Sequence, residues 1–432
     1  MEKNFKVGIY TLGCRVNQYE SEAISEAFER NGGIICDCSE ECDVYVINTC
    51  AVTEESVRKS RQIIRRMIKT NPNAFVCVCG CASQLDGKRM EQIDGVSLVC
   101  GNRNKNLLVS SAVDYITTGT VPKQNLAVDS LDSPIERMSI SEFRRVRAYV
   151  KIEDGCNFRC SYCIIPTVRG KVVLRDRDDI VSEVKELAKG GLPEVVLTGI
   201  ETSAYGDGLA ELLFDINEID GVERIRMGSL YPTFLKKEFI DRIAGLKKVM
   251  PHFHISVQSG SDRILRLMRR GYSAEDVVKT CDYIRKVMPE VCFTSDIIVG
   301  FPHETEEDFL ESERLIERTG MLHTHIFAYS KRPGTPAAEM DGQLPEDVKS
   351  DRSKRLHEVQ KRVKYGILKE ITDLKKPLSV LFEQHAGEYQ SGHTPNFIEV
   401  RAMSDRDLRG KTIKVIPSEI SDGVIIGSIT EE

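Results

Sequence analysis

The sequence predicts an α/β fold with an N-terminal parallel-sheet α/β domain, a central partial (β/α)6 barrel and a small C-terminal antiparallel β-barrel. Over the first hundred residues, apolar strand-like runs alternate with amphipathic helical runs, and from residue 148 this alternation resumes six times. Such alternation is typical of a parallel sheet covered by helices. After residue 377, short apolar runs separated by Gly, Asp and Ser indicate a small barrel.

The N-terminal domain is expected to span residues 1–117. Its strands are predicted at 6–10, 44–48, 75–79 and 98–100, and its helices at 18–30 and 54–69. Cys14, Cys50 and Cys81 each come just after a strand. The carboxyl ends of parallel strands share one edge of a sheet, which is where open α/β sheets bind ligands.

Residues 118–142 are polar, with scattered Pro and Ser, and are expected to form a linker. The central domain, residues 143–374, then has predicted strands at 148–152, 194–197, 224–227, 252–257, 292–299 and 325–328. Six such units form a partial barrel rather than a complete eightfold one, with the site at the C-terminal ends of the strands.

A charged helix over roughly 345–374 ends the central domain, and residues 375–432 make the C-terminal barrel. The strands of this barrel are expected at 378–382, 397–400, 412–416 and 424–429. The chain therefore combines two helix-covered sheets with a β-rich module at its end.

The chain has 432 residues and a net charge of −6, so no global basic field attracts nucleic acid, and no DNA partner is expected. The N-terminus lacks a signal peptide's apolar region, and no apolar run is long enough to span a membrane. A cytoplasmic protein without a membrane partner is therefore expected. In that compartment, 14 cysteines indicate metal binding or catalysis rather than disulfides, although free Cys is also a common buried residue.

The strongest local signal is a cysteine triplet on one loop after the first strand of the central domain. Cys156, Cys160 and Cys163 have the spacing C-x3-C-x2-C. A [4Fe–4S] cluster is normally held by four thiolates, so three leave one iron open to a ligand. A zinc site prefers four ligands in two pairs, and no second pair follows. The triplet therefore indicates an iron–sulfur cluster.

Here the sequence resembles the radical S-adenosylmethionine (SAM) superfamily, which uses this spacing to cleave SAM into a 5′-deoxyadenosyl radical. Further segments resemble its methylthiotransferase branch: 163–166, 169–170, 254–262, 296–305 and 329–337. Residues 392–400 are similar to the TRAM RNA-binding module, and residues 11–22 to the MtaB-type subgroup. The resemblance covers nearly the whole chain, in order.

The resemblance implies a second cluster, held by Cys14, Cys50 and Cys81, which agrees with their position after strands. Cys77 and Cys79 alternate with Cys81, so Cys79 remains an alternative ligand. Cys81 is preferred because Gly80 breaks the strand and puts Cys81 in a loop. Cys36, Cys38 and Cys42 also form a close group, but they are expected at the far edge of the sheet, as surface or structural residues.

The resemblance also suggests where SAM binds. Thr198 and Gly199 follow the second central strand, where the methionine end of SAM usually lies, and Glu201 is two residues further on. Gln258 and Asp296 are expected to terminate the fourth and fifth strands and to face the cavity. For Glu201, Gln258 and Asp296, a purely structural role is the alternative. The sequence identifies no general base.

RNA binding rests mainly on the resemblance. Between residues 352 and 376, nine Lys or Arg stand against three acids, a pattern that solvated helix faces often show. The C-terminal barrel is itself acidic, so phosphate contacts are expected mainly from the basic helix that leads into it.

The resemblance implies an enzyme that adds a methylthio group to C2 of N6-threonylcarbamoyladenosine next to the anticodon of tRNA. Its cofactors would be two [4Fe–4S] clusters and SAM, and its partners the tRNA anticodon stem-loop and an electron donor such as flavodoxin or ferredoxin. Two alternatives remain. One is a methylthiotransferase for isopentenyl-adenosine in tRNA or for a ribosomal-protein aspartate, and the other is a non-catalytic iron–sulfur RNA-binding protein.

Overall fold

The computed structural model describes residues 4–120, 126–128, 130–131 and 136–430. Its contacts divide the chain into two compact units. Unit 1 contains Met1–Ser141, Glu153–Arg175 and Ser330–Ala338, and unit 2 contains Glu142–Ile152, Asp176–Tyr329 and Glu339–Glu432. The cysteine loop after residue 153 thus belongs with the N-terminal sheet. The domain boundaries expected from the sequence stay a prediction.

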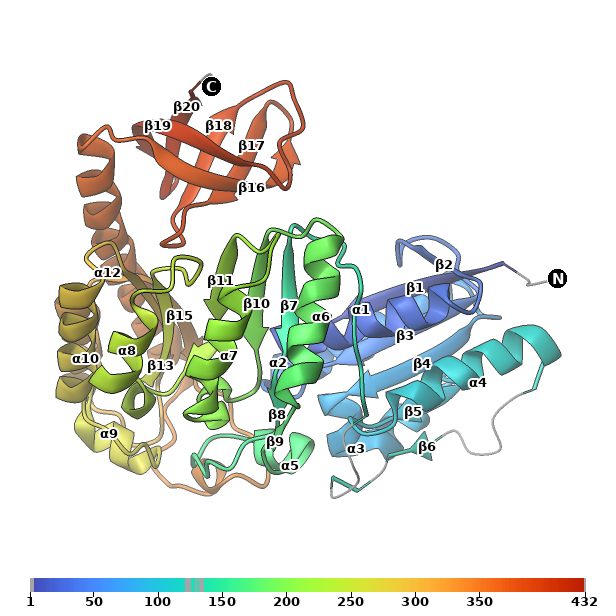
Figure 1. Cartoon of the computed structure of the whole chain (residues 1–432). Coiled ribbons are helices and arrows are strands. Elements are labelled where there is room, and N and C mark those ends of the chain that lie inside the picture. The colour runs from blue at the N-terminus through green and yellow to red at the C-terminus, as the bar shows by residue number, and fades with distance from the viewer. Residues whose placement is uncertain (1–3, 121–125, 129, 132–135, 431–432) are drawn as a thin grey trace. The chain divides into compact units, whose positions relative to one another are not determined.

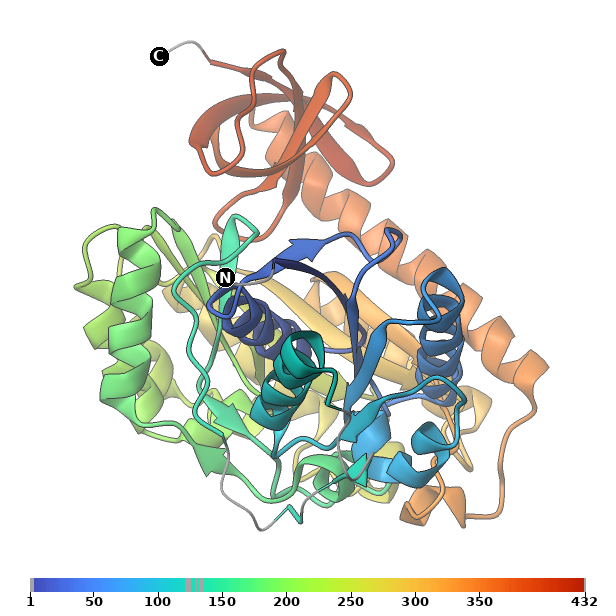
Figure 2. The same ribbon diagram turned by 90° about the vertical axis from the view of Figure 1, so that its right-hand side faces the viewer.

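Unit 1 is built on one parallel six-stranded sheet in the order β2-β1-β3-β4-β5-β6 (Figures 1 and 2). Its strands are β1 (Phe5–Thr11), β2 (Gly33–Cys36), β3 (Val44–Thr49), β4 (Phe75–Gly80), β5 (Leu98–Cys100) and β6 (Leu126–Ala127). The sequence predicted β1, β3, β4 and β5. The two edge strands, β2 and β6, were not expected, and β6 lies within the expected linker, of which residues 121–125, 129 and 132–135 lie outside the described part.

Helices cover both faces of this sheet. They are α1 (Arg15–Glu29), α2 (Glu54–Thr70), α3 (Cys81–Glu91) and α4 (Lys105–Thr118). Ile24 and Phe28 of α1 share one apolar core with Leu108 of α4, while Ile64 of α2 and Met90 of α3 belong to a second core. A buried parallel sheet needs such cover because both of its faces are apolar. The expected α/β domain is confirmed, with α1 beginning three residues earlier than predicted.

Unit 2 contains six parallel barrel strands and a short extra one, in two sheets. One sheet has the order β11-β10-β7 and the other β12-β13-β14-β15. The strands are β7 (Arg147–Lys151), β10 (Glu194–Thr198), β11 (Arg224–Met227), β12 (Ser229–Leu230), β13 (His252–Gln258), β14 (Cys292–Val299) and β15 (Met321–Ala328). The sheets divide at Gly228, whose N–H donates to the carbonyl of Leu197 at 2.7 Å. The partial (β/α)6 barrel is confirmed.

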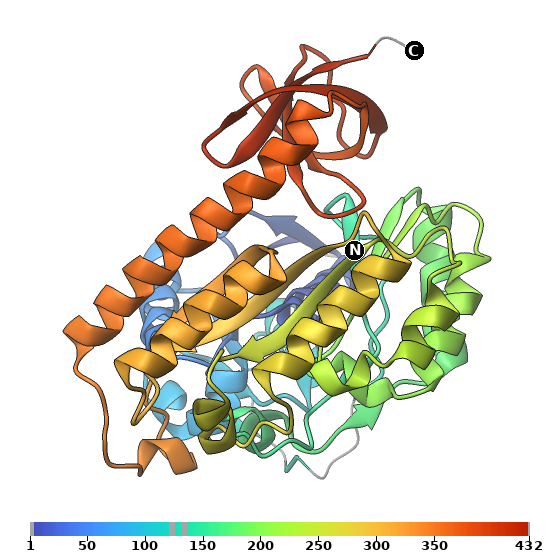
Figure 3. The same cartoon turned by 90° about the vertical axis from the view of Figure 1, so that its left-hand side faces the viewer.

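Helices follow these strands, as Figure 3 shows for the last of them. They are α6 (Arg177–Lys189), α7 (Gly208–Asn217), α8 (Lys237–Ile243), α9 (Asp262–Leu267), α10 (Ala274–Val287) and α11 (Glu306–Thr319). Ser273 and Thr305 begin α10 and α11 with capping boxes, in which each hydroxyl accepts the N–H of the third helical residue. These caps define where α10 and α11 begin.

The long helix α12 (Glu346–Asp373) leads into a closed five-stranded barrel. Its strands are β16 (Leu378–Ala386), β17 (Tyr389–His393), β18 (Glu399–Met403), β19 (Thr412–Ser421) and β20 (Val424–Ile429). The expected purely antiparallel pairing is wrong at one place, because β18 and β20 run parallel. A closed barrel with an odd number of strands cannot alternate direction throughout, so one pair must be parallel.

The interior of this barrel is continuous with the rest of unit 2. Val380, Phe382 and Val400 from the barrel share one apolar core with Leu368 of α12 and Leu322 of β15. Among the described residues, no helix is both long and apolar enough to cross a lipid bilayer.

Candidate functional site

The cysteine triplet lies on a tight loop of unit 1 between β8 (Glu153–Asp154) and α5 (Ile165–Arg169). The N–H of Cys156 donates to the carbonyl of Gly170 at 3.0 Å, and the N–H of Cys163 to that of Cys160 at 3.1 Å. Gly155 has φ +83°, and a Cβ there would meet the carbonyl oxygen of Lys171 at 2.1 Å. Backbone contacts at both ends of the loop therefore fix its course.

Cys14, Cys50 and Cys81 come together at the carboxyl edge of the same unit. They follow the adjacent strands β1, β3 and β4, and a Cβ on Gly13 would lie 3.2 Å from the Cys50 sulfur. Burial raises the pKa of the Cys50 thiol to about 11, and the neighbouring Cys81 and Cys14 thiols add to the rise. The fold thus gathers three thiols that are distant in sequence.

The donor set at both places consists of cysteine sulfur, the ligand that iron–sulfur clusters use. Within the described ranges, no three His, Cys, Asp or Glu side chains converge closely enough to hold a single metal ion. One group of three thiols lies on a single loop and the other follows three adjacent strands, and both suit a larger iron–sulfur group with one open iron.

Cys77 and Cys79 lie in a different apolar core from Cys81. Both are fully buried in the apolar core beneath α1 and α4, and burial raises the pKa of Cys79 to about 12. Gly80 then turns the chain with φ +97°, and Cys81 lies in the other core. The expectation that Cys81 sits in a loop is wrong, because it is the first residue of α3.

Cys36, Cys38 and Cys42 lie away from this edge. Cys42 precedes β3, whereas Cys50 follows the same strand. The backbone N–H of Cys42 donates to the Tyr45 hydroxyl at 3.0 Å. Cys36 and Cys38 pack against the core beneath α2 and α3. These contacts fit the structural role expected for this group.

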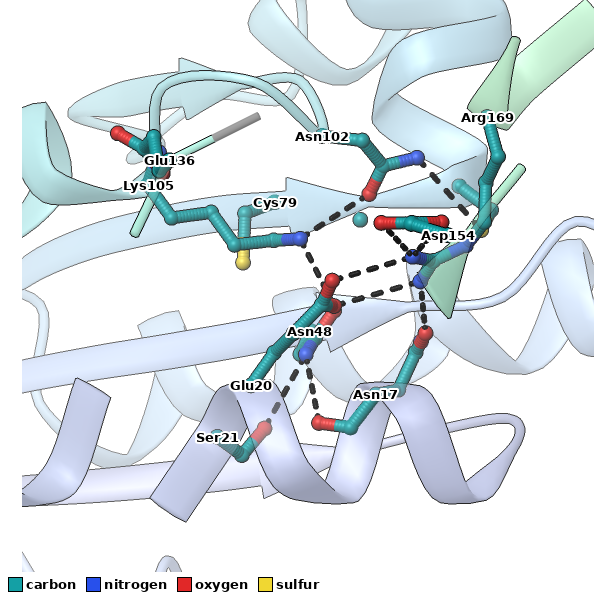
Figure 4. Close-up of polar contacts among 12 residues, drawn as sticks. Asn17, Glu20, Ser21, Asn48, Cys79, Asn102, Lys105, Glu136, Asp154 and Arg169 are labelled. Carbon is teal, nitrogen blue, oxygen red and sulfur yellow. Dashed lines mark hydrogen bonds and ion pairs between the residues drawn. The ribbon is translucent and has the colours of Figure 1, made fainter. Parts of the chain in front are cut away.

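A buried polar network joins Asp154 and Arg169, which flank the triplet in sequence, to Asn17 and Glu20 of α1 (Figure 4). The guanidinium of Arg169 donates to the Cys81 sulfur at 3.3 Å and to the amide oxygen of Asn17 at 2.6 Å. It also contacts both oxygens of Asp154 at 3.0 Å, and Glu20 at 3.1 Å. Sequence reasoning missed this network, although Asn17, Glu20 and Arg169 lie within segments that resemble the family.

The candidate SAM residues all lie in unit 2. Thr198 ends β10, and its carbonyl accepts the N–H of Ile152 at 2.9 Å. Glu201, just past Gly199, is buried, and this burial raises the pKa of its carboxyl group. Gln258 ends β13 with a left-handed φ of 74°, a backbone strain that often marks functional positions.

Asp296 is placed differently from the expectation. It does not terminate its strand but lies in the middle of β14, where its carboxylate contacts Nε2 of His254 at 3.0 Å. The register pairs Gln258 with Ile297, so Asp296 lies beside the end of β13. The strand continues to Val299, the bound that the sequence predicted for it.

Two families match most of the chain. Residues 150–316 match the radical SAM superfamily, and residues 6–101 match the uncharacterized protein family UPF0004. Among solved structures, the radical SAM methyltransferase TsrM from Kitasatospora setae has a TM-score of 0.57 at 17% identity, covering 78% of this chain and 77% of that chain. This likeness confirms the α/β fold.

Curated relatives extend the similarity over nearly the full length. The threonylcarbamoyladenosine tRNA methylthiotransferase MtaB of Bacillus subtilis is 36% identical, over 95% of this chain and 93% of its own. The MtaB of Aquifex aeolicus is 35% identical, over 95% and 100%. A tRNA-2-methylthio-N(6)-dimethylallyladenosine synthase of Acetivibrio thermocellus is also 35% identical, over 97% and 90%.

These relatives share one chemistry and differ in the modified adenosine that their names give. The expected enzyme class and cofactors are confirmed: this chain is an enzyme that uses SAM and [4Fe–4S] clusters. It belongs to the radical SAM methylthiotransferases, the family of these tRNA-modifying relatives.

Proposed function

We propose that this enzyme adds a methylthio group to C2 of N6-threonylcarbamoyladenosine in tRNA, at the position next to the anticodon. The observation that carries the proposal is the similarity to threonylcarbamoyladenosine methylthiotransferases of two distant bacteria, over 95% of the chain in both cases. Residues 11–22, which resemble the MtaB-type subgroup, form the end of β1 and the start of α1. That segment also carries Cys14, so the resemblance falls on a candidate cluster ligand.

Cys156, Cys160 and Cys163 would hold the cluster that binds SAM. When bound there, this cluster supplies the electron that cleaves SAM, and a donor such as flavodoxin or ferredoxin would supply that electron in turn. The loop's contribution is to keep three thiols on one short turn and leave one iron open. Its backbone bond from Cys156 to Gly170 holds the first of them in place.

Cys14, Cys50 and Cys81 would hold the second cluster, which holds or delivers sulfur. Thr198, Gly199 and Glu201 would contact the methionine end of SAM, and Gln258 and Asp296 would face SAM or the substrate. These residues orient the reactants and exclude water, which is the protein's share in cofactor chemistry.

The identity of the substrate is tested with tRNA in three modification states. Reduced enzyme is incubated with tRNA that carries threonylcarbamoyl-adenosine, isopentenyl-adenosine or unmodified adenosine, and nucleosides are analysed by mass spectrometry. Methylthiolation of the threonylcarbamoyl substrate alone is expected. Activity on the isopentenyl substrate alone would overturn the proposal and favour the activity named for the Acetivibrio thermocellus relative.

Fewer basic side chains in this part of the chain are available to bind tRNA phosphates than their number suggests. Five of the nine basic side chains counted at α12 contact acids: Arg352 with Glu304, Arg355 with Glu306, Lys361 with Glu358, Arg362 with Glu317 and Lys369 with Asp373. Phosphates must compete with these acids. Lys375 and Lys376, at the entrance to the barrel, are exposed, as is Lys414 on the adjoining β19.

Replacing Lys375, Lys376 and Lys414 together by Gln should therefore weaken tRNA binding by about tenfold or more at physiological salt. Filter binding at several salt concentrations gives the slope of log affinity against log salt concentration. The magnitude of this slope should fall by about two, because each of the lost phosphate contacts contributes about 0.7 to it. Lys361→Gln, at an ion-paired position, is the control and should change the affinity little. Equal effects of both changes would contradict this assignment.

A further inference from the structure

We propose that Arg169 is the positioning residue of the second cluster. In this proposal its guanidinium holds the sulfur of Cys81, and its positive charge raises the reduction potential of the cluster that Cys14, Cys50 and Cys81 bind. The inference rests on the proposed ligand role of these three cysteines, and it assigns a role to a residue that binds no iron itself.

The guanidinium contacts one of the three cysteines directly and reaches a second through Asn17. Its Nε–H donates to the Cys81 sulfur at 3.3 Å. Its Nη2 donates to the Oδ1 of Asn17 at 2.6 Å, and the same oxygen lies 3.7 Å from the Cys14 sulfur. Hydrogen bonds to ligand sulfur and the net charge nearby are the main protein terms that set a cluster's potential. The hydrogen bond to the Cys81 sulfur and the nearby positive charge both raise the reduction potential, because each stabilises the more negative, reduced cluster.

The orientation of this side chain is fixed by its other contacts. Arg169 is fully buried, and its Nη1 contacts both oxygens of Asp154 at 3.0 Å and Oε1 of Glu20 at 3.1 Å. The second Glu20 oxygen contacts the ammonium of Lys105 at 2.8 Å. Each edge of the planar guanidinium therefore has its own partner, and the Nε–H cannot turn away from Cys81.

A second donor reaches the same sulfur. The side-chain amide nitrogen of Asn102 lies 3.7 Å from the Cys81 sulfur and 2.8 Å from the carbonyl of Val168, the residue before Arg169. Its amide oxygen accepts from Lys105 at 3.2 Å. The Cys81 sulfur thus accepts from two side chains, Arg169 of α5 and Asn102 of the segment before α4. Figure 4 labels both donors.

The network around Cys81 holds charges of both signs. Three buried cations, Arg169, Lys105 and Arg103, lie beside the buried carboxylates of Glu20 and Asp154, and the carboxylate of Glu136 accepts the backbone N–H groups of Lys105 and Asn106. Of these charged groups, Arg169 donates a hydrogen bond directly to the Cys81 sulfur, so its positive charge would act on an anionic cluster held there.

Arg103 is a further cation of this network, next to Arg169. It is only 4% exposed, and its Nη2 donates to the carbonyl of Arg169 at 2.7 Å. Its Nε and Nη1 are buried and have no hydrogen-bond partner in the part of the chain that the structure describes. Leaving such donors unpaired costs free energy, which an anion nearby reduces.

Arg169 also belongs to the loop of the first cluster. It ends α5, six residues after Cys163, and the next residue, Gly170, accepts the N–H of Cys156 at 3.0 Å. One short segment therefore fixes Cys156 through its backbone and Cys81 through its side chain. A change at Arg169 reaches both cysteine groups, so the test must isolate one cluster.

The experiment uses the full chain with Cys156, Cys160 and Cys163 all replaced by Ala, which leaves only the second cluster. In this background, Arg169→Lys keeps the positive charge but loses the planar guanidinium. Arg169→Gln loses the charge and keeps a hydrogen-bond donor, and Arg169→Met loses both the charge and the donor. Each reconstituted protein is titrated with reductant while the reduced cluster is followed by electron paramagnetic resonance. The midpoint potential should fall from the Arg169 parent through Lys to Gln and Met.

For Arg169→Gln, the ratio of reduced to oxidised cluster at a fixed potential should drop at least about tenfold, which is 59 mV for one electron. Arg226→Met is the control, since Arg226 is an equally buried arginine that contacts Glu194 in unit 2. The midpoint potential of the cluster in Arg226→Met should equal that of the parent protein. If the Lys and Gln variants bind iron and their clusters keep the parental midpoint potential, the proposed role of Arg169 is overturned. The ligand assignment of the three cysteines would then still stand. A parent that binds no iron would overturn the ligand assignment on which this inference rests.

Discussion

Cys160→Ala is expected to abolish the formation of 5′-deoxyadenosine from SAM and to lower the iron content from about eight to about four per chain. Cys160 is the middle residue of the triplet, nearly buried, and the N–H of Cys163 donates to its carbonyl. Two remaining thiolates cannot hold a cubane cluster that also binds SAM. Iron analysis and liquid chromatography of reduced, SAM-treated protein measure both quantities.

Cys281→Ala provides the matched control for this prediction. Cys281 is a fully buried cysteine of α10, and it belongs to neither group of candidate ligands. The same chemical change there should leave the iron content and SAM cleavage at the parental level. Full iron with retained SAM cleavage in Cys160→Ala would contradict the assignment of the triplet.

Periodicity predicted the elements whose apolar pattern is long enough to be recognised. The helix α2 and the strand β14 were both expected at nearly their observed bounds. The edge strands β2 and β6 have four and two residues, so they carry too little pattern to be found. Leu126 of β6 is a strand residue only because it pairs with Val99 of β5, a contact that the local sequence does not encode.

The same distinction holds at the candidate site. Cys156, Cys160 and Cys163 are close in sequence, so their spacing alone revealed them. Arg169 and Glu20 are 149 residues apart, and they meet only because β8 and α5 fold onto the N-terminal sheet. A buried ion network leaves no periodic trace in the sequence, and Arg is normally expected at the surface.

Asp296 shows how a strand-end prediction fails. The sequence predicted the fifth barrel strand at 292–299, and Asp296 was expected to terminate it and to face the cavity. The structure pairs Asp296 with His254 on the neighbouring strand, so two polar side chains satisfy each other inside the barrel and the strand continues. Such cross-strand pairing depends on register, which a single sequence does not specify.

The choice between alternating cysteines is decided by Cys81→Ala and Cys79→Ala. We expect Cys81→Ala to lower the iron content from about eight to about four per chain, because the sulfur that accepts from Arg169 is lost. SAM cleavage without tRNA should continue in this variant, since the triplet remains. Methylthio transfer to tRNA should stop, which mass spectrometry of the nucleosides measures.

Cys79→Ala removes a sulfur that differs from Cys81 in position but not in chemistry. Cys79 is fully buried in the apolar core beneath α1 and α4, on the other face of the sheet from the core that contains Cys81. Losing it should leave iron content and methylthio transfer intact, and should lower the free energy of unfolding by only about 1 kcal/mol through the small cavity. If Cys79→Ala loses half of the iron while Cys81→Ala keeps all of it, the second cluster uses Cys79, and the turn at Gly80 does not select its ligand.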